Sequence, residues 1–465
     1  MAVAALALLL LAYIDAGLKA GPPPELVPEE ADWIVWAPDF PTFWNAFETN
    51  RAYRQLAGEL NHPLHRFELA AYEASGMRPT PIRWRAWLGS GMVLGSYDGA
   101  WGASVRPGLL MRLASMAHRV VRSPDGEGIR QYRELHYAWR DGELVISRDP
   151  EYVRAALSNI GGWTAQWESD GPDQIMLRWD HAGGGGELRL TARDPLSVSG
   201  WISPASPPAP AALRTATLDA AKPLVAVHAG DWRSLVGLYE ALPGGFERSS
   251  VYRIIRGAAE QLWLAWDFEP LPGGWDDGLT QASVALTGFD HDGPAPDPEL
   301  AFAFRRERPE QRAHPWRALY ENEYTVTYEW GPVTGEFMPV LGERFSLCFA
   351  RYDDQWFVTT REPLMADLML NATAGAAAEE DLLITMNWNE LAEALEDFLP
   401  ELAEYGLLGG MDRQDVAVDV TPYVNAAGAL SAGRIQGVIE DGRIEFRGAL
   451  TDPETYDGEP ENNGP

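Results

Sequence analysis

Short apolar runs, broken by Gly, Pro, Asn and Asp, make up most of the chain. This pattern is typical of β-strands joined by tight turns. Longer stretches with apolar residues at helical spacing are fewer. Three of the strand-and-turn patterns occur twice, in the same order, in the first and second halves of the sequence.

The first repeated pattern is a short strand that ends near an aspartate. Ile34–Phe40 lines up with Ala226–Trp232, and Asp39 matches Asp231. Aspartate side chains accept hydrogen bonds from the free backbone N–H groups at the start of a helix. The pattern therefore predicts a strand, an N-cap and a helix in each half.

The second repeated pattern is a hairpin followed by a helix. Tyr137–Ser147 resembles Phe349–Thr359, and Asp141-Gly142 is a favourable two-residue turn. Both hairpins run into Arg-acid-Pro, which suits the first turn of a helix. The predicted inward residues of these short helices are Val153 and Leu157 in one half and Leu364 and Leu368 in the other.

The third repeated pattern is a strand that again ends near a polar cap, where Ile175–Asp180 lines up with Ile384–Asn389. The halves then diverge. The first passes through Gly183–Gly186, interpreted as a plain loop. The second inserts a helix from about Glu390 to Leu407 before a hairpin at Asp441-Gly442.

Together these patterns predict an α+β fold. We expect two tandem duplicated units, each a mainly antiparallel β-sheet with helices packed on one side. Additional helices are expected where apolar residues recur at helical spacing, at Leu109–Val120 in the first half and Val251–Trp263 in the second.

Composition shifts set the expected domain boundaries, since dense proline excludes helix and central strand. The second unit contains the inserted helix, and the C-terminal tail is acidic and rich in Gly, Pro and Asn. The expected segments are a signal anchor or signal peptide at 1–20, a Pro-rich spacer at 21–30, the first unit at 31–202, a Pro/Ala linker at 203–213, the second unit at 214–450 and a disordered acidic tail at 451–465.

The N-terminal apolar run, Ala2–Ile14, has the length of a signal-peptide core and is shorter than the ~20 residues that span a bilayer. Leu18 stands where a signal-peptide cleavage site needs a small residue. An uncleaved anchor is therefore favoured over cleavage, with export and tethering to the membrane as the expected localisation. A buried N-terminal helix is the alternative.

The net charge of −31 makes nucleic acid and anionic lipid headgroups poor partners for the surface. Cys348 is the only cysteine and sits in an apolar run, so neither an internal disulfide nor a cysteine zinc site is expected. We expect Cys348 to be buried as a small apolar residue.

No motif commits the chain to a chemistry. A phosphate-binding loop, GxGxxG, GxSxG and HExxH are all absent from the sequence. His62 and His65 flank Pro63, which breaks the helix that would align them for a metal. Asp290–Gly293 with Asp297 has the acid density of a calcium loop but lacks the spaced acids and terminal Glu of an EF-hand, so it is interpreted as an irregular strand connection. The pairs Asp276-Asp277 and Asp353-Asp354 are interpreted as solvated turns rather than acid/base pairs. The sequence therefore predicts no catalytic, cofactor-binding or metal-binding residue and no enzyme activity, and leaves the ligand-binding residues unknown.

The repeated unit resembles a loosely defined bacterial family of exported, membrane-anchored proteins of unknown function. The resemblance is carried by an opening strand, a hairpin that runs into a short helix, and a second strand ending near an acid. Here these are Val35–Asp39, Asp141–Leu157 and Ile175–Asp180. The chain departs from the pattern in lacking a basic leader and in having Gly183–Gly186 in place of a helix. The family has no known catalytic residues to transfer.

Three functions remain open. The first is a non-enzymatic scaffold or interaction module in the cell envelope, tethered through the N-terminal segment, with a protein partner there. The second is a carrier of a lipid or other apolar ligand in a curved sheet. The third is a hydrolase with an unfamiliar site.

Overall fold

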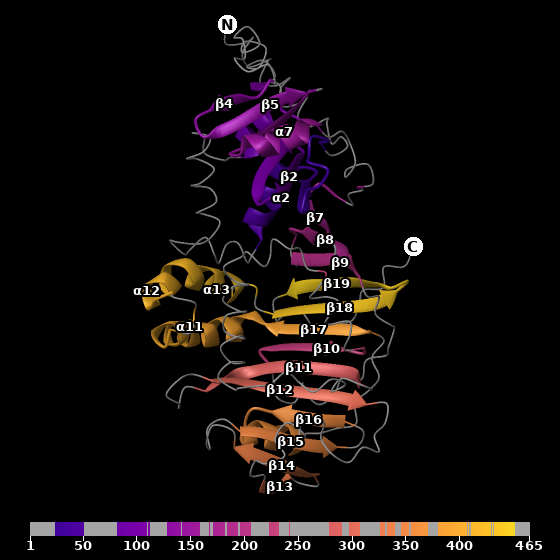
Figure 1. Cartoon of the computed structure of the whole chain (residues 1–465), viewed down its shortest axis with the longest axis vertical. Coiled ribbons are helices and arrows are strands. Elements are labelled where there is room, and N and C mark those ends of the chain that lie inside the picture. The colour runs from indigo at the N-terminus through magenta and orange to yellow at the C-terminus, as the bar shows by residue number, and fades with distance from the viewer. Residues whose placement is uncertain are drawn as a thin grey trace. The chain divides into compact units, whose positions relative to one another are not determined.

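The structure is a computed structural model of the whole chain (Figure 1). It has two compact units, Met1–Gly200 with Leu242–Phe246 (unit 1) and Trp201–Ala241 with Glu247–Pro465 (unit 2). The residues that it describes are 24–50, 81–108, 110–111, 128–140, 142–158, 167, 171–181, 184–193, 196–205, 223–231, 241, 279–290, 297–306, 326–330, 333–339, 346–352, 355–370, 380–406, 408, 411–428, 430 and 432–451. Of the predicted helix at Leu109–Val120, only residues 110 and 111 are described, and both are helical. The predicted helix at Val251–Trp263, the apolar N-terminal run and the acidic tail after residue 451 lie outside these residues.

Unit 1 is built on an antiparallel sheet whose central strand, β1, pairs with β2 on one side and β7 on the other. The strand order is β4-β5-β6-β3-β2-β1-β7-β8-β9. The strands are β1 (Trp33–Ala37), β2 (Met92–Tyr97), β3 (Ala100–Val105), β4 (Arg130–Tyr132), β5 (Leu135–Arg140), β6 (Glu143–Ser147), β7 (Gln174–His181), β8 (Gly184–Thr191) and β9 (Leu196–Pro204). The residues of β9 from Trp201 onward are assigned to unit 2.

Unit 2 is also an antiparallel sheet, with β10 as the central strand between β11 and β17. Its order is β13-β14-β15-β16-β12-β11-β10-β17-β18-β19. The strands are β10 (Val225–Ala229), β11 (Leu279–Asp290), β12 (Asp297–Arg306), β13 (Val326–Trp330), β14 (Val333–Pro339), β15 (Ser346–Tyr352), β16 (Gln355–Thr359), β17 (Leu382–Asn387), β18 (Ala432–Glu440) and β19 (Arg443–Thr451). The antiparallel α+β fold predicted from the sequence is present.

In unit 1 the helices lie against both faces of the sheet, so the prediction of helices on one side was wrong there. Face A carries Ala138 and Val145, which are covered by α7 (Pro150–Ser158). Face B carries Met92, Val105 and Leu144, which contact side chains of α2 (Phe40–Thr49) and α5 (Pro81–Leu88). Adjacent residues of a strand point to opposite faces, and here both sets are apolar. A sheet that is apolar on both faces needs cover on both.

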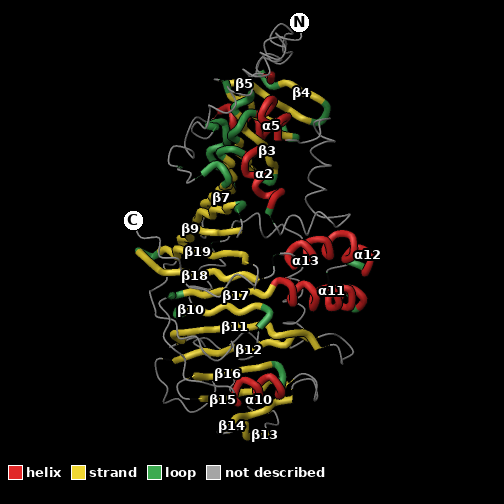
Figure 2. Tube along the Cα trace, turned by 180° about the vertical axis from the view of Figure 1, so that it is seen from behind, coloured by secondary structure: helices red, strands yellow, loops and turns green. Residues whose placement is uncertain are grey.

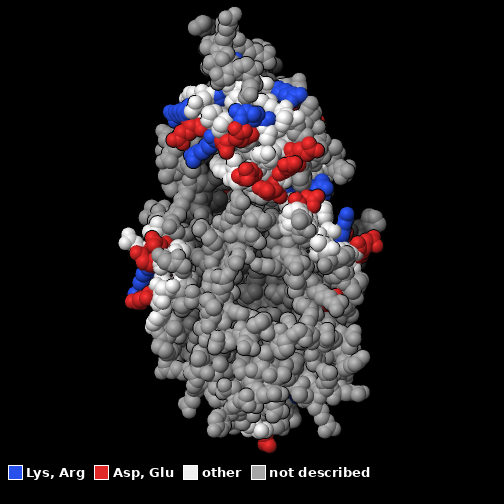
Figure 3. Space-filling view, viewed as in Figure 1, with Lys and Arg blue, Asp and Glu red and all other residues white. Residues whose placement is uncertain are grey.

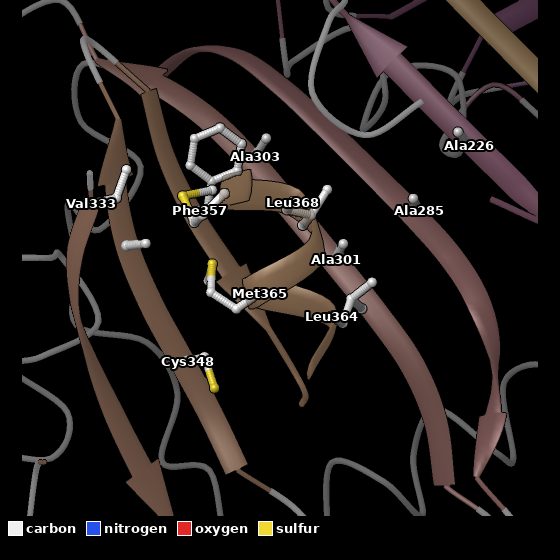
Figure 4. Packing of buried hydrophobic residues seen from close by; sticks show 12 residues of the cluster. Ala226, Ala285, Ala301, Ala303, Val333, Cys348, Phe357, Leu364, Met365 and Leu368 are labelled. Carbon is white, nitrogen blue, oxygen red and sulfur yellow. The ribbon is translucent and has the colours of Figure 1, made fainter. Parts of the chain in front are cut away.

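In unit 2, face A is covered by α10 (Glu362–Leu370), the helix that follows the β15–β16 hairpin. Figure 4 shows its side chains packed over small residues of the strands. Cys348 is fully buried in this cluster, as predicted. The predicted inward residues Leu364 and Leu368 are also buried there.

A helical insertion (Trp388–Gly428) separates β17 from β18, close to the position predicted for an added helix. It consists of α11 (Trp388–Glu404), α12 (Arg413–Asp415), η4 (Val416–Val420) and α13 (Thr421–Gly428), which lie beside the sheet of unit 2 in Figure 2. Its own apolar core includes Phe398, whose ring stacks on Phe289 of β11 at 3.9 Å between centroids.

The Gly183–Gly186 loop was predicted wrongly, because β8 begins at Gly184. A Cβ at Gly186 would lie 2.3 Å from the Trp179 ring on the neighbouring strand. The glycine therefore makes room for that ring within the sheet.

Residues 24–30 were assigned to the spacer, but they lie against unit 1. The backbone N–H groups of Glu25 and Leu26 donate to the buried Glu143 carboxylate, at 2.7 and 3.2 Å. Leu26 is buried beneath α7, and Val27 is buried in the neighbouring cluster of face A. Residues 24–30 are thus part of the packed structure of unit 1. Ser203 and Pro204, assigned to the linker, end β9.

Candidate functional site

His228 and Ser283 form a buried polar pair in the strands of unit 2. The imidazole Nδ1 lies 3.0 Å from the Ser283 Oγ. His228 is 1% exposed and Ser283 is 5% exposed. A buried polar group is stable only when it has a hydrogen-bond partner. The contact between the imidazole and the hydroxyl gives each of them one.

Strand register brings the two residues together. His228 of β10 lies directly opposite Ser283 of β11. Two residues earlier on the same face, Ala226 lies opposite Ala285. Directly opposed side chains in an antiparallel pair are about 5 Å apart at Cβ, within reach of a hydrogen bond.

Unit 1 has an apolar pair at the same place in its own sheet. Trp36 lies opposite Val93, two residues beyond the Ile34–Gly95 pair. Both are buried, and the Trp36 ring contacts Trp167 with 5.5 Å between centroids. At this place in the central strands, unit 2 therefore has a polar pair where unit 1 has an apolar pair.

The His228–Ser283 pair belongs to a polar part of face A that lies beside the apolar cluster under α10. Gln281 is buried two residues before Ser283, and Gln436 of β18 is in register with Leu383 next to His228. One row further, Arg434 lies opposite Thr385. Arg434 is 3.7 Å from the Glu380 carboxylate.

A serine next to a histidine is the start of a hydrolytic site, since histidine can take the hydroxyl proton. Such a site also needs an orienting acid and access for a substrate. The buried carboxylate of Asp381 accepts a hydrogen bond from the Ile439 backbone N–H at 2.7 Å. In the described structure the pair is enclosed, and the arrangement stabilises the sheet rather than exposing a nucleophile.

A second buried carboxylate, Glu143, is surrounded by donors in unit 1. Besides the N–H groups of Glu25 and Leu26, it accepts from Arg106 Nε at 2.8 Å. Three donors including a guanidinium satisfy an ionised carboxylate in a buried setting. This group joins Glu25 and Leu26 to β6.

Most residues considered for metal binding from the sequence lie outside the described residues, namely His62, His65 and 291–293. The same is true of the carboxylate pairs Asp276-Asp277 and Asp353-Asp354. Asp290 ends β11 and Asp297 begins β12, opposite each other in register. Within the described ranges, no group of three or more His, Cys, Asp or Glu side chains is arranged to hold a metal ion.

Ser283 was not singled out in the sequence. The available signal was the alternation of Gln281 and Ser283 with apolar residues in β11, at the period of a strand face, together with His228 in place of Trp36. Only the pairing of β10 with β11 shows that the two polar residues meet.

Comparisons with known proteins found no matching family model, no similar curated protein and no similar solved structure. Across the described residues, no helix is long and apolar enough to cross a membrane.

Proposed function

We propose that the protein is a non-enzymatic interaction module of the cell envelope, exported and tethered through its N-terminal apolar segment. Its helical insertion forms the contact surface for a protein partner. The observation that carries the proposal is that the insertion has its own apolar core while presenting the exposed side chains of Tyr405 and Val418. Exposed apolar residues at the edge of a charged surface are common in protein interfaces.

Duplication of one ancestral unit is part of this proposal. It is supported by the strand order, because β1, β2, β3, β6, β5 and β7 have the same neighbours as β10, β11, β12, β16, β15 and β17. The helix that follows the hairpin covers face A in both units. Unit 1 has no helix between β7 and β8, which are joined across residues 182–183. The insertion is therefore an addition to a shared plan.

The charge of the insertion indicates the kind of partner. Arg413 is its only basic residue, and it is 3.6 Å from Glu404. The acidic residues are Glu390, Glu393, Glu396, Asp397, Glu401, Glu404, Asp412, Asp415 and Asp419. A surface of one sign favours a partner with a basic contact surface and increases its association rate at low salt.

Crosslinking in intact cells tests the proposal. A photoreactive residue at Tyr405 should give a partner adduct that is lost in a Val418→Asp variant. The matched control is Leu370→Asp, a change at an exposed apolar residue outside the insertion. An adduct pattern that is the same in both variants would contradict the assigned surface. Recovery of the native protein in the soluble cytosolic fraction would contradict export.

A hydrolase is the second candidate, favoured by the 3.0 Å contact between His228 and Ser283. A fluorophosphonate reagent should label the wild-type protein at Ser283, and the label should be absent from Ser283→Ala, if this pair is catalytic. We expect no labelling at Ser283, because the hydroxyl is buried.

A further inference from the structure

Two exposed aromatic side chains lie in one row on face B of unit 1. Trp101 of β3 is 60% exposed and Tyr132 of β4 is 55% exposed. A single exposed ring is ordinary on a protein surface, whereas exposed rings aligned in one row form a surface that a ligand can span. The row is traced by register, from Tyr132 opposite Leu135 to Trp101 opposite Ser96.

The strands that carry the two rings, β4 and β3, are three strand-to-strand spacings apart in the sheet. β4, β5, β6 and β3 are consecutive neighbours in the sheet, so Tyr132 and Trp101 are about 14 Å apart along the row. Both side chains emerge next to hairpin turns, at Arg133-Glu134 and at Asp98-Gly99. Trp33 of β1, opposite Ser96, continues the row as a half-buried residue.

Arginine side chains accompany the aromatic rings. Arg133 lies over the Tyr132 ring, with its guanidinium carbon 5.7 Å from the centroid. Arg148 follows the last residue of β6, the strand between β5 and β3. It is 3.9 Å from Glu134 in an ion pair whose two side chains are both exposed. Such an exposed pair contributes little, so a ligand carboxylate can replace Glu134 at low cost.

The fold does not require aromatic residues in this row. In unit 2 the corresponding row of β10, β11 and β12 carries Val225, Leu286 and Leu300. In unit 1 the apolar core of face B is formed two and four residues further along β2 from Ser96, where Leu94 and Met92 pack with side chains of α2 and α5. Trp101 and Tyr132 are outside that core.

We propose that this row binds a carboxylated glycan, with pyranose rings stacked on Trp101 and Tyr132 and a sugar carboxylate at Arg148. The negative face of an aromatic ring attracts the polarised C–H groups of a pyranose. Arginine binds carboxylates through two parallel hydrogen bonds. Nucleic acid also carries rings and negative charge, but it has a phosphate on every nucleotide, so the net charge of −31 opposes it more strongly than a glycan with a carboxylate on every second sugar.

Isothermal titration calorimetry on the full chain tests this site. The carboxylated probe is a tetrasaccharide of alternating N-acetylglucosamine and N-acetylmuramic acid, and the neutral probe is a tetrasaccharide of N-acetylglucosamine alone. We expect binding of both, tighter for the carboxylated probe. Trp101→Ala should weaken both by about tenfold or more, the scale of one lost ring stack.

Two further variants separate the contributions of the site. Arg148→Gln should weaken binding of the carboxylated probe and leave that of the neutral probe unchanged. Leu370→Ala, at an exposed apolar residue in unit 2, should change neither. The proposal is overturned if neither glycan binds at millimolar concentration, or if Trp101→Ala binds as wild type. A protein captured through Trp101 while neither glycan binds would overturn it too. Because Trp101 and Tyr132 are exposed, far-UV circular dichroism should be unchanged in all variants.

Discussion

The ring of Tyr152 lies directly on the backbone of Gly102. A Cβ at Gly102 would be 2.3 Å from the Tyr152 ring, and a Cβ at Gly95 would be 2.8 Å from its hydroxyl. Tyr152 is the third residue of α7, and the third residue of α10 is Leu364, which lies beside Ala301 in Figure 4. In unit 1 the large Tyr152 side chain therefore lies on glycines, whereas in unit 2 the smaller Leu364 side chain lies beside an alanine.

This size relationship predicts a rescue. Gly102→Ala should destabilise unit 1 by about 2 kcal/mol, because the added methyl group overpacks the contact. Adding Tyr152→Leu should recover much of the loss, so the double mutant is more stable than the sum of the single changes predicts. Urea unfolding of the full chain measures this. Additive effects would show that the two residues are not coupled, and Ala301→Gly in unit 2 is a control for a glycine change in a strand.

A second prediction concerns the Tyr152 hydroxyl, which has no hydrogen-bond partner and is fully buried. Burial raises the pKa of this hydroxyl above its usual value. In the unfolded chain the Tyr152 hydroxyl ionises at about pH 10, whereas in the native state it keeps its proton to a higher pH. The free energy of unfolding is therefore unaffected by this group below about pH 10 and falls as the pH rises above that value.

Tyr152→Phe should therefore leave stability at neutral pH unchanged or slightly higher, since it removes an unsatisfied buried group. It should also shift alkaline unfolding of unit 1 to higher pH. Circular dichroism during a pH titration measures the midpoint. Tyr132→Phe, at an exposed hydroxyl, should not move it, and an unchanged midpoint in Tyr152→Phe would refute the assignment.

The third prediction concerns the Glu143 carboxylate. Glu143→Ala removes the acceptor for the Glu25 and Leu26 N–H groups and leaves Arg106 without its 2.8 Å partner. Breaking a buried pair in this way costs about 3 kcal/mol. Hydrogen exchange at residues 25–27 should also become faster. Glu134→Ala, at an exposed carboxylate, is the control and should alter neither property.

The fourth prediction separates the two roles of Asp39. Its carboxylate caps α2 through the Thr42 N–H at 3.2 Å and pairs with Arg85 of α5 at 2.7 Å. Asp39→Asn keeps a good cap and loses the charge, whereas Asp39→Ala loses both. The alanine variant should be about 1 kcal/mol less stable than the asparagine variant, the usual value of a cap. Equal unfolding midpoints would show that the cap contributes nothing.

The hairpins and their helices could be predicted from the sequence because the signals are local. In unit 1 Tyr137 lies opposite Ile146, and in unit 2 Phe349 lies opposite Val358, as the matched sequences require. Asp39 caps its helix, and Asp441 and Gly442 both have positive φ in the predicted turn. Turn and cap chemistry depends on residues a few positions apart, so one sequence is enough.

The third repeated pattern was aligned with an error of two residues. Ile34 of β1 lies opposite Arg178, while Ala226 of β10 lies opposite Thr385 rather than Asn387, the residue matched to Arg178 in the sequence. A shift of two keeps every side chain on its face of the sheet. The alternation of apolar and polar residues is therefore the same in both alignments, and only strand pairing distinguishes them.

By itself, the sequence determined the antiparallel α+β class, the hairpins, the caps and the position of the inserted helix. Tertiary structure alone decided which residues meet across strands. It joined His228 to Ser283, placed Tyr152 on Gly102, brought Glu143 to the backbone of Glu25 and Leu26, and set Trp101 and Tyr132 in one row. These contacts join residues far apart in the chain. They follow from register and from which face is covered, and neither is encoded in any short segment.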